Sequence, residues 1–122
     1  MGKSAVVAVL AAIVVLVWAA TALGKAGDVY VASNDGVEGV YKVGPGGGAA
    51  TALSTSPSFN EPWGMAMLPN GDLLVADLAA DAIFQVNSRT GVTSTYLSGP
   101  ALGSPVDIAL GPDGFLYVRS FR

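Results

Sequence analysis

A strand–turn–strand pattern that occurs twice, 43 residues apart, constrains the fold of this chain more than any other feature. Residues 62–77 contain an apolar run, a Pro-Asn-Gly turn at 69–71 and a second, almost wholly apolar run. Residues 105–120 follow the same order around a Pro-Asp-Gly turn at 112–114. In each turn proline fixes φ, and glycine supplies the positive φ that a tight hairpin needs. A hairpin repeated at this period is typical of a β-propeller blade.

The second half of this pattern occurs three times, at residues 27–33, 71–77 and 114–120. The apolar core of each segment does not alternate with polar residues, so we expect strands covered on both faces by neighbouring sheets. Weaker patterns predict third strands at 39–43 and 82–86, and exposed fourth strands at 50–54 and 92–97.

Larger and smaller side chains alternate along the two innermost predicted strands. We expect the larger ones to fill the space between sheets and the smaller ones to lie where strands converge. The larger residues are Met65, Met67, Ile108 and Leu110, and the smaller ones are Gly64, Ala66 and Ala109.

The predicted fold is therefore all-β, a partial β-propeller of about two to two and a half four-stranded antiparallel blades. Residues 27–58 form a partial blade, 62–99 a full blade and 105–122 a second partial blade. A propeller needs at least ~4 blades to close its ring. Either the chain is a fragment of a longer protein, or copies self-associate to complete the ring. We expect a fragment, because open repeats leave sheet faces and edges uncovered.

The N-terminal segment, residues 1–26, is predicted to be a signal peptide or a membrane anchor. Lys3 precedes an apolar run over residues 5–24, and small residues at Ala20 and Ala22 fit cleavage after Ala22. The same run is long enough to cross a bilayer as a hydrophobic helix. Both alternatives place the propeller outside the cytoplasm, either secreted or anchored to the membrane.

Composition excludes several function classes. The chain has no cysteine and no histidine, which removes thiolate metal sites and the commonest general base. Its net charge is −3, so nothing in the charge balance favours nucleic acid as a partner.

Polar residues gather in the loops that join strand four to strand one and strand two to strand three. These loops share one face of a propeller, which we call the loop face. Hard cations such as Ca²⁺ prefer several oxygen ligands, whereas Asp and Asn in turns commonly bond to local backbone. We expect turn-capping roles for most of the set, and above all for Asp77. The loop-face residues are Asn34, Asp35, Glu38, Asn60, Glu61, Asp77 and Asp81, with Asp107 just inside.

Asp107 is the most informative single residue, because it replaces Gly64 of the preceding repeat. A carboxylate there should meet water, an ion or a backbone donor. Trp63 either lines a pocket or packs beneath the loop. The candidate ligand-binding residues are Asp107, Trp63, Glu61 and Asn60. The candidate ligands for Ca²⁺ or another divalent cation are Asp107, Glu61, Asp35 and Glu38.

The pattern Pro-x-Gly-x-Ala-x-x-Pro-Asn/Asp-Gly-x-Leu-x-Val-Ala-Asp resembles the repeat of NHL-type propellers. It is also similar to streptogramin lyase-like and SMP-30/gluconolactonase-like six-bladed propellers, and the resemblance covers residues 27–122. The gluconolactonase-like resemblance implies Asn or Asp metal ligands just after the proline of the innermost strand, where this chain has Trp63 and Val106. Glu61 lies near an implied ligating Glu, but the surrounding spacing differs. The lyase-like resemblance implies a histidine, which this chain lacks.

We therefore expect an exported or membrane-anchored propeller segment that binds a protein or small molecule on its loop face, or acts as a scaffold. Catalysis by this chain alone is not expected. One alternative is a fragment of a metal-dependent hydrolase, with Asp107 and Glu61 as local contributors. Another is a membrane-tethered structural interaction protein.

Overall fold

The computed structural model of the chain describes residues 27–122, which form three antiparallel sheets. The strands are β1 (Val29–Ser33), β2 (Gly39–Val43), β3 (Thr51–Ser54), β4 (Pro62–Met67), β5 (Leu73–Asp77), β6 (Ala82–Val86), β7 (Thr93–Ser98), β8 (Pro105–Leu110) and β9 (Leu116–Ser120). A short 3₁₀ helix, η1 (Pro100–Leu102), precedes β8. The predicted signal or anchor segment and its hydrophobic helix lie outside the described residues. No helix within residues 27–122 has the length and hydropathy to span a bilayer.

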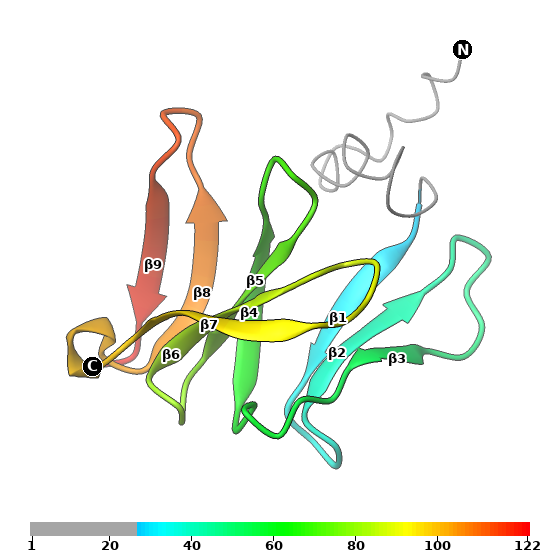
Figure 1. Cartoon of the computed structure of the whole chain (residues 1–122), viewed down its shortest axis with the longest axis horizontal. Coiled ribbons are helices and arrows are strands. Elements are labelled where there is room, and N and C mark those ends of the chain that lie inside the picture. The colour runs from blue at the N-terminus through cyan, green and yellow to red at the C-terminus, as the bar shows by residue number, and fades with distance from the viewer. Residues whose placement is uncertain (1–26) are drawn as a thin grey trace.

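The three sheets follow one another in chain order, as Figure 1 shows, and we call them the first, second and third blades. The first blade holds β1–β3, the second β4–β7 and the third β8–β9, each strand pairing with its neighbour in sequence. This part of the chain is all-β and consistent with a partial β-propeller, as the repeat predicts. The third strands, β2 and β6, have the bounds that the sequence predicts.

Two apolar clusters hold the blades together. The first lies between the first and second blades and includes Val40, Leu73 and Phe84, whose ring meets that of Phe59 edge to face at 5.5 Å. The second joins the second blade to the third and is built on Leu74, Ala76, Ile83 and Ile108. Alternate residues of β5 thus face opposite neighbours, which explains why residues 73–76 are all apolar.

Of the three equivalent strands β1, β5 and β9, only β5 is covered on both faces, so the expectation of complete burial is wrong for β1 and β9. Val29 of β1 is 47% exposed, whereas Leu73, at the same position of β5, is 3% exposed. Tyr117 of β9 is 56% exposed, and its counterpart Leu74 is fully buried. Among the described residues no sheet covers the outer faces of the first and third blades, and burial depends on such a neighbour.

The alternation predicted along the innermost strands, with the larger side chains filling the space between sheets, is confirmed where a neighbouring blade is present. Met67 and Ile108 are buried, and Met65 packs against the first cluster. Ala66, on the opposite parity, packs against the second cluster. Ala109 occupies the same position in β8 and is exposed, because no described blade follows it.

Register shifts recur at equivalent places in successive blades. One extra residue enters the innermost strand between Pro62 and Met65 in β4, and between Pro105 and Asp107 in β8. Such bulges bend a strand and redirect its side chains. Here they lie at the loop-face end of β4 and β8, where they shape the candidate site.

Candidate functional site

The loop that leads into β4 is fastened by the buried carboxylate of Asp77, the last residue of β5. Asp77 Oδ2 accepts a hydrogen bond from the Asn60 N–H at 2.8 Å, and its Oδ1 accepts from Glu61 at 2.9 Å and Ala80 at 3.0 Å. Its side chain is 0% exposed, so these donors replace water around the charge. Asp77 is therefore a structural anchor that orients Asn60 and Glu61.

Trp63 is an aromatic residue that the loop face presents to solvent. Its indole N–H donates to Glu61 Oε1 at 3.2 Å, and the side chain is 51% exposed. Of the two predicted alternatives, packing beneath the loop is wrong. The hydrogen bond to Glu61 restricts the ring and leaves an apolar surface available for contact.

Asp107 lies directly beside the Trp63–Gly64 segment, so the structure brings these candidate residues together. A Cβ added to Gly64 would lie 2.7 Å from both Asp107 Cα and the Val106 carbonyl oxygen. Only glycine permits this approach between the innermost strands of neighbouring blades. The bulge after Pro62 and the missing side chain together seat β8 against β4.

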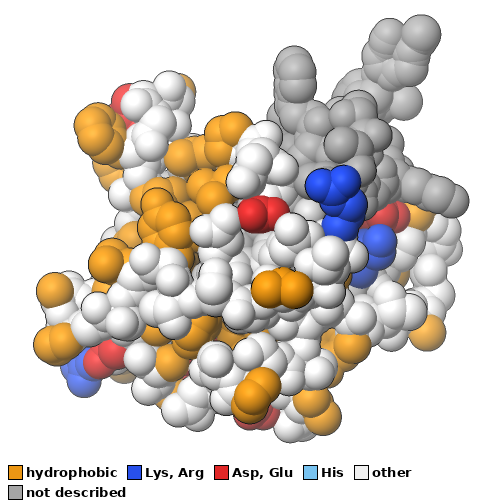
Figure 2. Space-filling view, in the orientation of Figure 1, with side chains coloured by type: hydrophobic (Ala, Val, Ile, Leu, Met, Phe, Trp, Pro, Cys, Tyr) orange, Lys and Arg blue, Asp and Glu red, His pale blue; other side chains and the backbone are white. Residues whose placement is uncertain are grey.

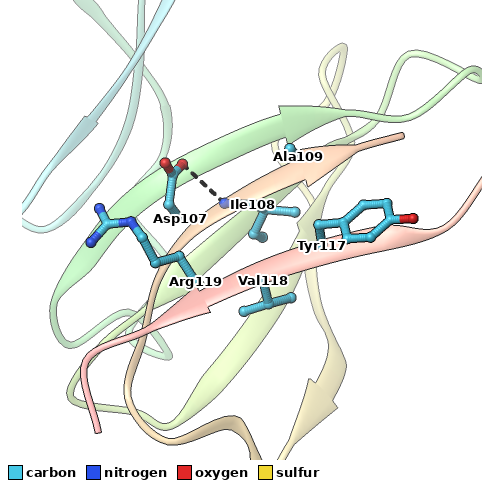
Figure 3. Close-up of a pocket in the computed structure, with 6 residues that line it drawn as sticks. All are labelled: Asp107, Ile108, Ala109, Tyr117, Val118 and Arg119. Atoms are coloured by element: carbon cyan, nitrogen blue, oxygen red, sulfur yellow. Dashed lines mark hydrogen bonds between the residues drawn. The ribbon is translucent and has the colours of Figure 1, made fainter. Parts of the chain in front are cut away.

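The Asp107 carboxylate is exposed and accepts a hydrogen bond from the Ile108 N–H at 3.0 Å. Asp107 thus has both the solvent contact and the backbone donor that a carboxylate at this position needs. Arg119 is its cross-strand partner on β9, and Figure 3 shows both side chains at one end of a shallow hollow. This hollow measures about 230 Å³ and extends past Ala109 to Tyr117. Sequence reasoning missed Arg119, although the register about the 112–114 turn places it opposite Asp107.

The two remaining metal candidates belong to the first blade. Asp35 lies in the exposed turn between β1 and β2, where its backbone exchanges hydrogen bonds with the Ser33 hydroxyl. Glu38 ends the same turn. Within residues 27–122 no three carboxylates are close enough together to hold a metal ion. The structure thus does not gather Asp107, Glu61, Asp35 and Glu38 into one cluster, and a Ca²⁺ or other divalent cation site stays a prediction.

A second anchor fixes the loop before β8. Asp81 Oδ1 accepts a hydrogen bond from the Ser104 N–H at 2.6 Å, and its carboxylate pairs with Arg122 at 3.1 Å. At the end of β9, the Ser120 hydroxyl donates to the Leu102 carbonyl. Loop-face polar residues therefore mainly hold the connections between blades, as expected for Asp and Ser in turns.

Two tyrosines at equivalent positions of the first and third blades show how a neighbouring blade changes their chemistry. Burial raises the pKa of Tyr30, which packs against the first cluster, and the Asp28 charge adds to this shift. Tyr117 is exposed and donates its hydroxyl to Asp113 at 2.6 Å. That bond raises the pKa of Tyr117 and lowers the pKa of Asp113, because it stabilises phenol and carboxylate together.

Comparison with known families places a repeat in this region. Residues 59–80 match the NHL repeat, and this match spans the loop that Asp77 anchors together with β4 and β5. No curated protein matches the chain. The NHL match agrees with the resemblance in the sequence and with the inner half of the second blade.

Proposed function

We propose that this chain is an exported NHL-type propeller segment that binds a protein through the loop face around Trp63, without catalysis by the chain itself. The match to the NHL repeat supports this proposal, because NHL repeat domains generally mediate protein interactions. Export is proposed from Lys3 and the apolar run at 5–24, and the intact mass of the mature protein tests whether that run is removed.

The observation that carries the proposal is the exposed, oriented indole of Trp63. Trp and Arg dominate the binding energy of protein interfaces, and a side chain held before binding loses less entropy. Trp63 is fixed by Glu61, and Glu61 by Asp77 through its backbone. Asp107 lies beside this segment, with Arg119 across from it. A half-apolar, half-charged surface of this kind suits an extended peptide or a protein loop.

The hydrolase alternative has less support from these residues. In the SMP-30/gluconolactonase-like resemblance, the positions after Pro62 and Pro105 carry metal ligands, and this chain has Trp63 and Val106 there. Neither side chain offers an oxygen to a cation.

The proposal is tested with peptides selected from a phage-displayed random library against the purified chain. Fluorescence anisotropy then compares the affinity of each peptide for the wild type, Trp63→Ala and Tyr96→Ala. Tyr96 is the matched control, because it is similarly exposed but lies on the outermost strand, β7. We expect Trp63→Ala to weaken binding by about tenfold or more, and Tyr96→Ala to leave it unchanged. Selected peptides that bind Trp63→Ala as tightly as the wild type would overturn the proposal.

A further inference from the structure

The two ends of the described structure carry uncovered faces that correspond to faces already packed together inside the chain. Each blade has a leading face toward the next blade and a trailing face toward the previous one. In the second blade, Leu74 and Ile83 form the leading face and pack against Ile108 of the third blade. Leu73 and Phe84 form its trailing face and pack against Val40 of the first blade. The same contact is thus made twice within one chain.

The leading face of the third blade is open. It presents Ala109 and Tyr117 around the hollow, which the cross-strand neighbours Asp107 and Arg119 also line. Figure 2 shows hydrophobic side chains over the β8–β9 hairpin on the side turned toward the viewer. Tyr117 occupies the position of Tyr30, which packs against the second blade. The third blade is therefore equipped for a neighbour that the described chain does not supply.

Among residues 27–122, nothing packs on the trailing face of the first blade either, and this face is apolar. Val29 and Val31 lie on it, both more than two-fifths exposed, at positions where β5 has the buried residues Leu73 and Val75. The leading face of the third blade, with Ala109 and Tyr117, and the apolar trailing face of the first blade, with Val29 and Val31, are therefore both uncovered in the described structure. Stacking one on the other continues the interface that joins the blades already present.

Asp107 restricts which kind of blade can cover the third. Its counterpart Gly64 has no room for a Cβ, because the backbone of β8 runs 2.7 Å from that position. A following blade with an innermost strand placed like β8 would meet the Asp107 side chain with its own backbone. The described part of the first blade begins at β1 and has no strand equivalent to β4. Within residues 27–122, the first blade therefore places no innermost strand against Asp107 in such a contact.

We propose that the chain self-associates head to tail, with the leading face of the third blade of one copy packed on the trailing face of the first blade of a second copy. Such a contact is heterologous, so each copy still offers one free face, and further copies close a ring or extend a stack. It uses the sides of the end blades. Asp107 and Arg119 border both this contact and the proposed binding surface, but the contact does not require binding at Trp63.

The test is the molar mass of the full chain, measured by light scattering after size-exclusion chromatography in mild detergent. The protein concentration is raised to about 100 μM, which exceeds the dissociation constants of weak specific contacts. The wild type should reach at least twice the mass of one copy. Val31→Asp damages the trailing face and Ala109→Arg the leading face, and each variant alone should be monomeric. Mixed together, they should form a pair with one copy of each, since each retains the face that the other lost. Val92→Asp, the same change at a more exposed valine on the outer rim, should leave the assembly intact.

The pairing of two differently tagged variants also shows that both are folded, and matching circular dichroism spectra confirm it. A wild type that stays monomeric over this range overturns the proposal. So does an oligomer that persists in both single variants, which would place the contact elsewhere, including the 5–24 segment. Variants that dissociate but do not pair when mixed would indicate a two-fold symmetric contact and would also overturn it.

Discussion

Replacing Asp77 by alanine tests how the second blade holds the loop that carries Asn60, Glu61 and Trp63. The carboxylate is fully buried and accepts three backbone hydrogen bonds of 2.8–3.0 Å. A hydrogen bond to a charged group contributes about 1.5–3 kcal/mol. The donors of Asn60 and Glu61 are only partly buried, so water recovers part of this on substitution. We therefore expect Asp77→Ala to lower the free energy of unfolding by about 3–5 kcal/mol, a large share of the 5–15 kcal/mol typical of a domain.

Asp77→Asn sharpens this prediction because it keeps the shape of the side chain. Its one oxygen can accept from Glu61 and Ala80, which share Oδ1, but its amide nitrogen then faces the N–H of Asn60. The loss should be about 1–3 kcal/mol, the cost of leaving one partly buried donor unsatisfied. Urea unfolding followed by Trp63 fluorescence measures both variants, and Asp35→Ala is the exposed control, expected within about 0.5 kcal/mol of the wild type. Equal stabilities for Asp77→Ala and the wild type would refute this account of the loop.

Three further predictions follow from contacts between and within the blades. Gly64→Ala should destabilise the fold by about 1–3 kcal/mol, because its Cβ would overlap the backbone of β8. The control Gly44→Ala, whose Cβ would meet nothing within 4 Å, should be neutral. Equal urea midpoints for these two variants would contradict the close approach of β8 to Gly64. Leu74→Ala should cost about 2–5 kcal/mol by opening a cavity between the second and third blades, and a smaller loss in the same assay would mean that these blades do not pack there. Ultraviolet titration should show Tyr117 ionising above the usual range, and Asp113→Asn should remove the contribution of the carboxylate; an unchanged Tyr117 curve in that variant would disprove the pairing. Because the pKa of Asp113 is lowered, the stabilisation by this pair should be complete above the ordinary pKa of aspartate and lost as the pH falls through the lowered value, which carboxyl NMR can follow.

The sequence predicted the hairpins and their order because these features are local and repeated. The turns at 69–71 and 112–114 set the register of β4–β5 and β8–β9, and alternating side-chain size set their packing parity. Both signals lie within a few residues of the structure they specify. The 43-residue period then predicted that equivalent strands would occupy equivalent places in successive blades.

Features that depend on distant partners were beyond the sequence. The exposure of Val29 and Tyr117 is decided by the neighbouring blade and not by their own strands, which read as buried. The role of Asp81 requires Ser104 and Arg122 to fold back onto it. The separation of the metal candidates in the structure has the same origin, since Asp35 lies one blade away from Glu61.

The central claim is that successive hairpins stack as blades, so that β5 is covered on both sides. Residue-resolved amide hydrogen exchange of the native protein tests this most directly. The amides of Leu73–Asp77 should be the slowest in the described chain, because they lie at the centre of the sheet and between both apolar clusters, whereas those of the rim strand Thr93–Ser98 should exchange much faster. Exchange of β5 at the rate of β7 would contradict the stacked arrangement.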